Sequence, residues 1–198
     1  TEVKYNTGRE EDREILYAVP TLKYLLILLD VENSASALSD IKRMKLHNLI
    51  VMSCGEIKFD EVPDSVVRIS IIMVAESQSI SIPEGKFAKM KSLTMCLGSS
   101  SESDKYTLSL PYIPSLTYLY IKADFWNNDN GERLFVRIDK QNRISRLCFY
   151  ECTIDILDVD GYDKELLSVG CCTVENTEKC DDMKIRCLEI INDHEQID

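Results

Sequence analysis

A spaced apolar pattern recurs along almost the whole chain and limits what the chain can fold into. Each copy holds three apolar residues in the order apolar, two others, apolar, one other, apolar, as in Leu22, Leu25 and Ile27. The eight copies occupy residues 22–27, 46–51, 66–71, 90–95, 116–121, 144–149, 166–171 and 185–190. Their starts are 19 to 28 residues apart, with a mean of about 23. Repeats of this period bury their apolar faces against one another, so the pattern predicts a solenoid.

This pattern resembles the leucine-rich repeat family, whose frame is L-x-x-L-x-L-x-x-N/C-x-L. Cys54 and Cys152 stand at the Asn/Cys position of that frame. The other six copies place different residues there, namely Asp30, Val74, Gly98, Asp124, Val174 and Asp193. The resemblance implies an α/β leucine-rich repeat solenoid, or horseshoe, with a parallel β-sheet on its concave face. The convex face should then mix short helices, strands and loops, and the six departures predict an irregular solenoid without a continuous asparagine ladder.

The chain is expected to form one domain with a distinct start. Residues 1–19 are predicted to be an N-terminal capping segment, with a charged helix over 9–18 that ends before Pro20. Residues 20–198 form the predicted repeat domain. A doubly wound sheet is the rival fold, but it usually has a glycine-rich loop after its first strand, and this sequence has none.

The segments that return from one repeat to the next differ in their patterns. Helix is predicted over 34–45, a shorter helical turn over 83–90 and a further helix over 160–167. Alternating apolar residues predict extra strands over 107–110 and 134–138, beside polar loops at 99–104 and 125–133. The convex side should therefore be of mixed structure.

Charge and hydropathy exclude several classes of partner. The chain has 23 Lys and Arg against 34 Asp and Glu, a net charge of −11, which disfavours binding to nucleic acid and to anionic membranes. The longest apolar run, at 24–29, is far shorter than the roughly 20 residues of a membrane-spanning helix. We therefore expect neither nucleic acid binding nor a membrane span.

The sequence offers no set of catalytic groups. It has only two histidines, His47 and His194, and neither is paired in sequence with a nucleophile. Motifs for serine hydrolases, zinc proteases and phosphate-binding loops are missing. A structural zinc site needs two close cysteine pairs, and the pair Cys148 and Cys152 places one member outward on a strand and the other inward at a turn. We expect a protein without enzymatic activity, cofactor or metal.

The cysteines bear on the cellular compartment. Four of the eight lie in the last 28 residues, namely Cys171, Cys172, Cys180 and Cys187. A disulfide between two of them resembles the cysteine-stapled caps of extracellular leucine-rich repeat proteins, although buried free thiols are an equal alternative. The even number of cysteines and a first residue other than Met favour secretion, with the cytoplasm as the alternative. Short divergent repeat proteins of this kind are also similar to proteins that eukaryotic parasites secrete toward a host.

Residues between the apolar positions should point outward from the predicted sheet, because side chains alternate along a strand. The candidate partner-binding residues on this face are Tyr24, Leu26, Leu28, Ile50, Met52, Ile72, Tyr118, Tyr120, Lys122, Arg146 and Tyr150. Contiguous apolar residues and tyrosines beside cations are typical of protein interfaces. The sequence thus predicts a non-enzymatic module that binds a protein partner. The alternative is a structural protein that uses the same face to form a homodimer.

Overall fold

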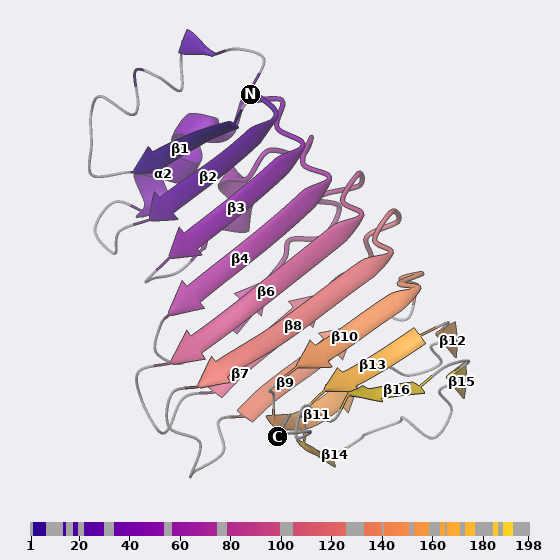
Figure 1. Ribbon diagram of the computed structural model, residues 1–198. Helices are drawn as coiled ribbons and strands as arrows, with labels where there is room; N and C mark the ends of the chain where they lie inside the picture. The colour runs from indigo at the N-terminus through magenta and orange to yellow at the C-terminus, as the bar shows by residue number, and fades with distance from the viewer. Residues whose placement is uncertain are drawn as a thin grey trace, which may run out of the picture.

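The computed structural model is a solenoid whose coils add parallel strands to two sheets (Figure 1). It describes residues 2–6, 14, 18–19, 22–29, 34–53, 57–74, 79–99, 105–125, 133–139, 141–150, 153–158, 163–164, 166–170, 173–176, 184–185 and 188–191, with no side chains beyond 149. The predicted solenoid is confirmed.

One face of the solenoid is a nine-stranded parallel sheet, here called the front sheet. Its strands are, in spatial order, β1 (Glu2–Asn6), β2 (Tyr24–Leu29), β3 (Asn48–Ser53), β4 (Arg68–Val74), β6 (Ser92–Ser99), β8 (Tyr118–Phe125), β10 (Arg146–Tyr150), β13 (Leu166–Gly170) and β16 (Leu188–Ile191). Spatial order follows chain order, as expected when each coil is laid on the one before it. Strand β1 lies within the predicted capping segment 1–19 and pairs with β2.

A five-stranded parallel sheet, here called the back sheet, lies behind the front sheet (Figure 1). Its strands are β5 (Ser79–Ser81), β7 (Lys105–Leu110), β9 (Arg133–Ile138), β11 (Thr153–Asp158) and β14 (Thr173–Asn176). The predicted extra strands at 107–110 and 134–138 are β7 and β9. A third, small sheet pairs β12 (Asp163–Lys164) with β15 (Lys184–Ile185).

Among the described residues, regular helix lies mainly in the early coils. Helix α2 (Ser34–Ile41) confirms the first helical prediction but ends before the basic residues that were expected to close it. A short 3-10 helix, η1 (Phe59–Glu61), follows in the next return segment. The prediction at 160–167 was wrong, because its described residues belong to β12 and β13. Of the predicted capping helix over 9–18, only Glu14 and Ala18 are among the described residues.

The helical turn predicted at 83–90 was also wrong, and the backbone shows why. Gly85 has a φ of 73° and Phe87 a φ of 60°, both in the left-handed region that interrupts a right-handed helix. The segment instead forms two separate turns. The Phe87 ring is fully buried and meets the Phe59 ring edge to face at a centroid distance of 6.2 Å. This packing holds Phe87 in a conformation that a bulky residue rarely adopts.

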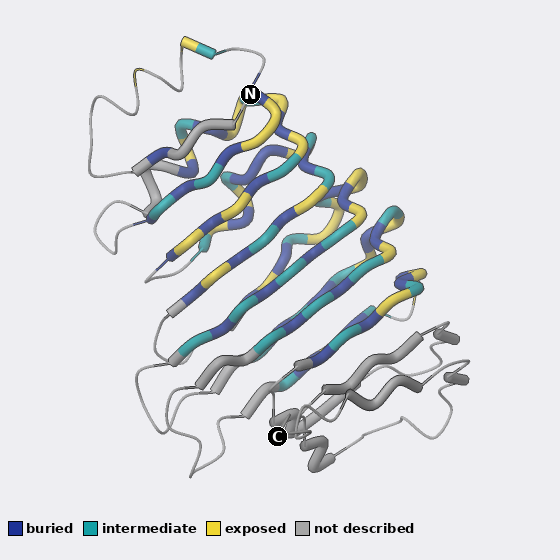
Figure 2. The backbone as a smooth tube through the Cα atoms, in the orientation of Figure 1, coloured by how far each residue is buried: buried dark blue, intermediate teal, exposed yellow. Residues whose placement is uncertain are grey.

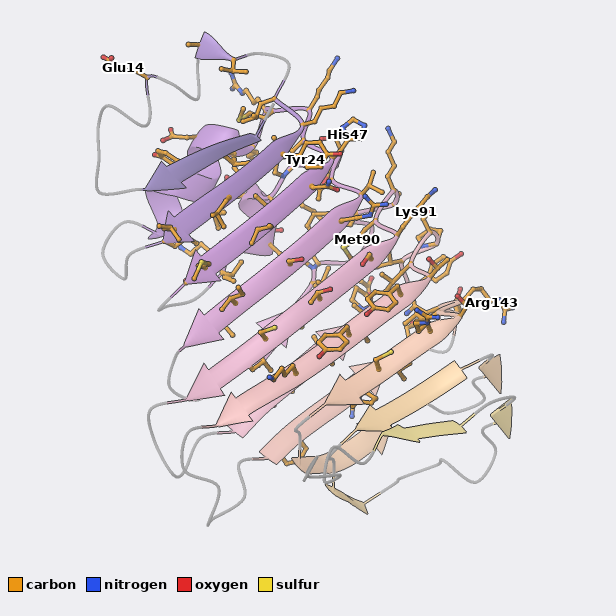
Figure 3. The ribbon with its side chains drawn as sticks, viewed as in Figure 1. Glu14, Tyr24, His47, Met90, Lys91 and Arg143 are labelled. Atoms are coloured by element: carbon orange, nitrogen blue, oxygen red, sulfur yellow. The ribbon has the colours of Figure 1, made fainter. Side chains whose placement is uncertain are left out.

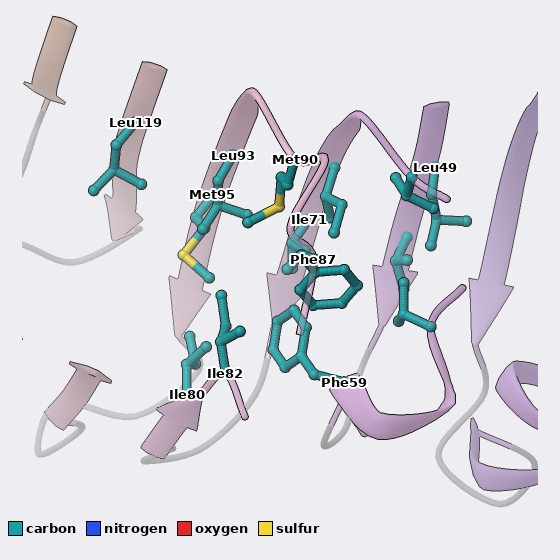
Figure 4. Packing of buried hydrophobic residues seen from close by; sticks show 14 of the residues in the cluster. Leu49, Phe59, Ile71, Ile80, Ile82, Phe87, Met90, Leu93, Met95 and Leu119 are labelled. Atoms are coloured by element: carbon teal, nitrogen blue, oxygen red, sulfur yellow. The ribbon is translucent and has the colours of Figure 1, made fainter. Parts of the chain in front are cut away.

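The apolar pattern forms the core between the sheets (Figure 4). All three apolar positions are buried in each of the first six copies, which are the copies whose side chains the structure describes. Side chains of the back sheet, such as Ile80, Leu108 and Val136, belong to the same cluster. Each fully buried aliphatic side chain contributes roughly 1.5–3 kcal/mol, so these positions hold the coils together.

The seventh copy has a different register from the one predicted. The sequence pattern pairs Val169 and Cys171 with the second and third apolar positions of the other copies. In the structure Leu167 pairs with Leu147 and Val169 with Phe149, so the frame is shifted by two residues. Gly170 accordingly lies beside Tyr150, and Ser168 takes the place predicted for Gly170.

Candidate functional site: the open face of the front sheet

The outward residues of β2 to β10 form the open face, which is the front-sheet surface opposite the core. Figure 2 shows buried and less buried residues alternating along these strands. Strand pairing places these residues in three rows that run across the strands. The first row contains Tyr24, Asn48, Arg68, Ser92, Tyr118 and Arg146. The second contains Leu26, Ile50, Ser70, Thr94, Tyr120 and Cys148. The third contains Leu28, Met52, Ile72, Cys96, Lys122 and Tyr150.

The open face is mostly apolar over β2, β3 and β4, where six of the nine positions in the three rows carry apolar or aromatic side chains. We call this the apolar half, and its residues are Tyr24, Leu26, Leu28, Ile50, Met52 and Ile72. Tyr24 is 47% exposed, and Ile50, Met52 and Ile72 are each 38–39% exposed. Leu28, Met52 and Ile72 are direct neighbours on three adjacent strands. The structure therefore brings together the six apolar residues predicted from the sequence.

The other half of the face, over β6, β8 and β10, is polar and aromatic. Tyr118, Tyr120 and Lys122 alternate along β8 and are each partly exposed, while Arg146 is exposed at the start of β10. Two half-buried thiols, Cys96 and Cys148, lie on the same face, and neither is in a disulfide. Tyr150 lies in register with Lys122, but its side chain is outside the described part.

The environment of Tyr118 is altered by its neighbours. Burial raises the pKa of its hydroxyl above the usual value of 10.0, and the adjacent Cys148 raises this pKa further. Arg146, in register with Tyr118 on the next strand, acts in the opposite direction. Tyr118 is thus a neutral hydrogen-bonding group at physiological pH, which suits a binding surface.

Sequence reasoning missed Arg68 as a residue of this face. It is exposed and stands in the first row, between Tyr24 and Tyr118. From that row only Tyr24, Tyr118 and Arg146 were predicted. Its position in the repeat was the available signal, because it directly precedes the second apolar position, as Tyr24 and Arg146 do in their repeats.

Other predicted features fall partly outside the described part of the chain. The four C-terminal cysteines, Cys171, Cys172, Cys180 and Cys187, lie outside it, so their pairing stays a prediction. Within the described residues, no three His, Cys, Asp or Glu side chains converge as metal ligands. No helix in that same portion is both long and apolar enough to cross a membrane.

Comparisons of the chain with known protein families, with curated proteins and with solved structures find no match. The geometry of the open face therefore carries the functional argument.

Proposed function

We propose that this protein is a non-enzymatic binding module and that a protein partner docks on the open face. The observation that carries the proposal is the apolar half, where Ile50, Met52 and Ile72 remain more than a third exposed on adjacent strands. A soluble protein rarely keeps such a contiguous apolar surface unless another surface covers it.

The energetics of burial favour this use. Ile50, Met52 and Ile72 are fixed by a sheet whose opposite face is packed in the core, so a partner would order few side chains on binding. Covering apolar surface contributes roughly 25 cal/mol for each Å² removed from water. Tyr118 and Tyr120 add rigid aromatic surface beside Arg146, a combination that is common among the residues dominating interface affinity.

We further propose that the fold is a divergent leucine-rich repeat. One parallel front strand per repeat and three buried apolar positions per copy support this assignment. In that case the open face corresponds to the concave face that the resemblance implies. The strands of the back sheet replace the helices of more regular repeats from β5 onward.

The test is an affinity capture with matched variants. Met52→Asp combined with Ile72→Asp places two charges in the apolar half, whereas Ser81→Asp places one on an exposed position of the back sheet. We expect a partner captured by wild type and by Ser81→Asp to be lost from the double variant. A double variant that is folded by circular dichroism and still captures the same partner would exclude the open face as the site.

The alternative function is self-association through the same apolar half. The compactness of the Leu28, Met52 and Ile72 row favours it, because two copies related by a twofold axis could bury the row against itself. Sedimentation at high protein concentration separates the two readings. A wild-type dimer that dissociates in the Met52→Asp and Ile72→Asp double variant supports the homodimer, and a monomer excludes it.

A further inference from the structure

The negative charge of the chain is concentrated at one end. Residues 151–198 contain 14 acidic and four basic side chains, whereas residues 1–150 contain 20 acidic and 19 basic ones. The part of the molecule that carries the open face is therefore almost neutral. Its local charges decide what it attracts, and the overall net charge of −11 does not.

Basic side chains line the edge where the front strands begin. We call this line the basic edge, and its residues are Lys23, Lys45, Arg68, Lys89, Lys91, Arg143 and Arg146. All seven are exposed. Each lies directly before, or one or two residues after, the first buried apolar residue of its repeat, and no Asp or Glu occupies any of these positions in the first six repeats.

The parallel strands bring these residues to one side of the molecule. His47, Lys91 and Arg143 extend from the same edge in Figure 3, at the starts of β3, β6 and β10. Backbone hydrogen bonds between neighbouring coils fix this alignment. Tyr118, the first residue of β8, donates its N–H to the carbonyl of Lys91, the residue directly before the neighbouring strand β6. Five strand spacings of about 4.8 Å separate β2 from β10, so the edge is about 24 Å long.

The basic edge is not neutralised by the described part of the chain. The ion pairs there join Lys42 to Glu61 at 3.2 Å and Lys86 to Asp64 at 3.0 Å. Neither pair involves a residue of the basic edge. The short polar side chains between the cations turn back to the coils instead, as Thr117 and Ser145 do by donating to the carbonyls of Lys91 and Thr117.

From this juxtaposition we infer that the open face takes an extended polypeptide segment that carries both carboxylates and apolar side chains. The inference rests on the proposed function and names the chemistry of its partner. The carboxylates of the segment would lie along the basic edge, and its apolar side chains would contact the apolar half. Tyr24 and Arg68 share one row of the face, so both kinds of contact are within reach of one segment.

A nucleic acid fits this surface less well. It could contact the basic edge, but it has no aliphatic side chains to cover Ile50, Met52 and Ile72. Its dense charge would also be repelled by the acidic residues of 151–198. A short acidic and apolar segment carries few charges and meets both requirements.

The probe for the test is a fluorescent peptide of about eight alternating glutamate and leucine residues, long enough to follow the edge at about 3.3 Å per residue. A lysine and leucine peptide and a short single-stranded DNA serve as comparators. We expect the acidic peptide to bind in fluorescence anisotropy, with an affinity that falls as salt is added. The double variant Arg68→Glu with Lys91→Glu should weaken binding at least about tenfold.

Lys58→Glu is the matched control, because Lys58 is exposed but precedes η1 on a return segment away from the basic edge. It should bind the acidic peptide as wild type does. The inference is overturned if wild type does not bind this peptide, if the Arg68 and Lys91 double variant binds it as well as Lys58→Glu does, or if the lysine peptide or the DNA binds more tightly.

The same variants keep this inference separate from the proposed function. Suppose that the Met52 and Ile72 double variant no longer captures the partner but the Arg68 and Lys91 double variant still does. The open face then binds its partner, and the inference that the partner segment carries carboxylates is wrong. If the Met52 and Ile72 double variant retains the partner, the proposed function itself fails.

Discussion

Asn142 is a polar residue whose side chain joins two consecutive coils. It is 1% exposed, and its Oδ1 accepts a hydrogen bond from Ile113 N at 2.8 Å. Its Nδ2 donates to the carbonyls of Pro111 and Asp139 at 2.9 and 3.1 Å. The side chain thus supplies an acceptor for the buried Ile113 N–H and a donor for the part-buried Pro111 carbonyl. Its role is structural.

Removing that side chain should therefore cost more than a surface change. We expect Asn142→Ala to lower the free energy of unfolding by about 2–4 kcal/mol, because the buried Ile113 N–H loses its acceptor and the part-buried Pro111 carbonyl loses a donor. The neighbouring Gln141→Ala, at an exposed position, should cost less than about 0.5 kcal/mol. Urea unfolding of the two variants measures the difference, and equal losses would contradict the bridging role.

At the scale of the strand, adjacent residues have opposite roles. Ile71 is 1% exposed and faces the core, whereas Ile72 is 38% exposed on the open face. We expect Ile71→Ala to lose about 2–4 kcal/mol of stability and Ile72→Ala less than about 1 kcal/mol. The two substitutions remove the same atoms, so thermal unfolding of the pair reports the register of β4 directly. A larger loss at Ile72 would mean that the strand faces the other way.

The strands were predictable because alternation and spacing are local properties. The three-position pattern fixes which side chains of β2 to β10 are buried, so the apolar half and the tyrosines of the open face could be named from the sequence. The seventh copy failed because Leu166 and Leu167 are adjacent leucines. The pattern was assigned with Leu166 as its first apolar residue. Strand pairing puts Lys164 at the first position of this repeat, with Leu167 and Val169 at the second and third.

The return segments were less predictable because tertiary contacts decide them. Pro83 near the start of the segment suggested a helical turn at 83–90, and only the burial of Phe87 against Phe59 explains the left-handed backbone found there. The basic edge was missed for another reason. Its residues are scattered over five of the first six repeats, so the sequence and its net charge of −11 do not show that the strands bring them to one edge.

At the scale of the molecule, each coil contacts mainly its two neighbours. A cavity in the middle of such a stack should weaken nearby coils more than distant ones. We expect Leu119→Ala to increase amide hydrogen exchange most in β6, β8 and β10 and much less in β2 and β3. Mass spectrometry of proteolytic fragments measures this gradient. A uniform increase over the whole chain would show that the coils unfold as one unit.

The backbone hydrogen bonds at the start of each front strand keep the open face in register although the return segments differ in length. Successive repeats begin 20 to 28 residues apart over the first six copies, yet their first outward residues stay in register. Insertions in a return segment are therefore absorbed behind the sheet. Outward side chains of the front sheet can therefore be exchanged one at a time while the strand register stays constant. A new binding specificity then requires new residues on the open face but no new backbone geometry.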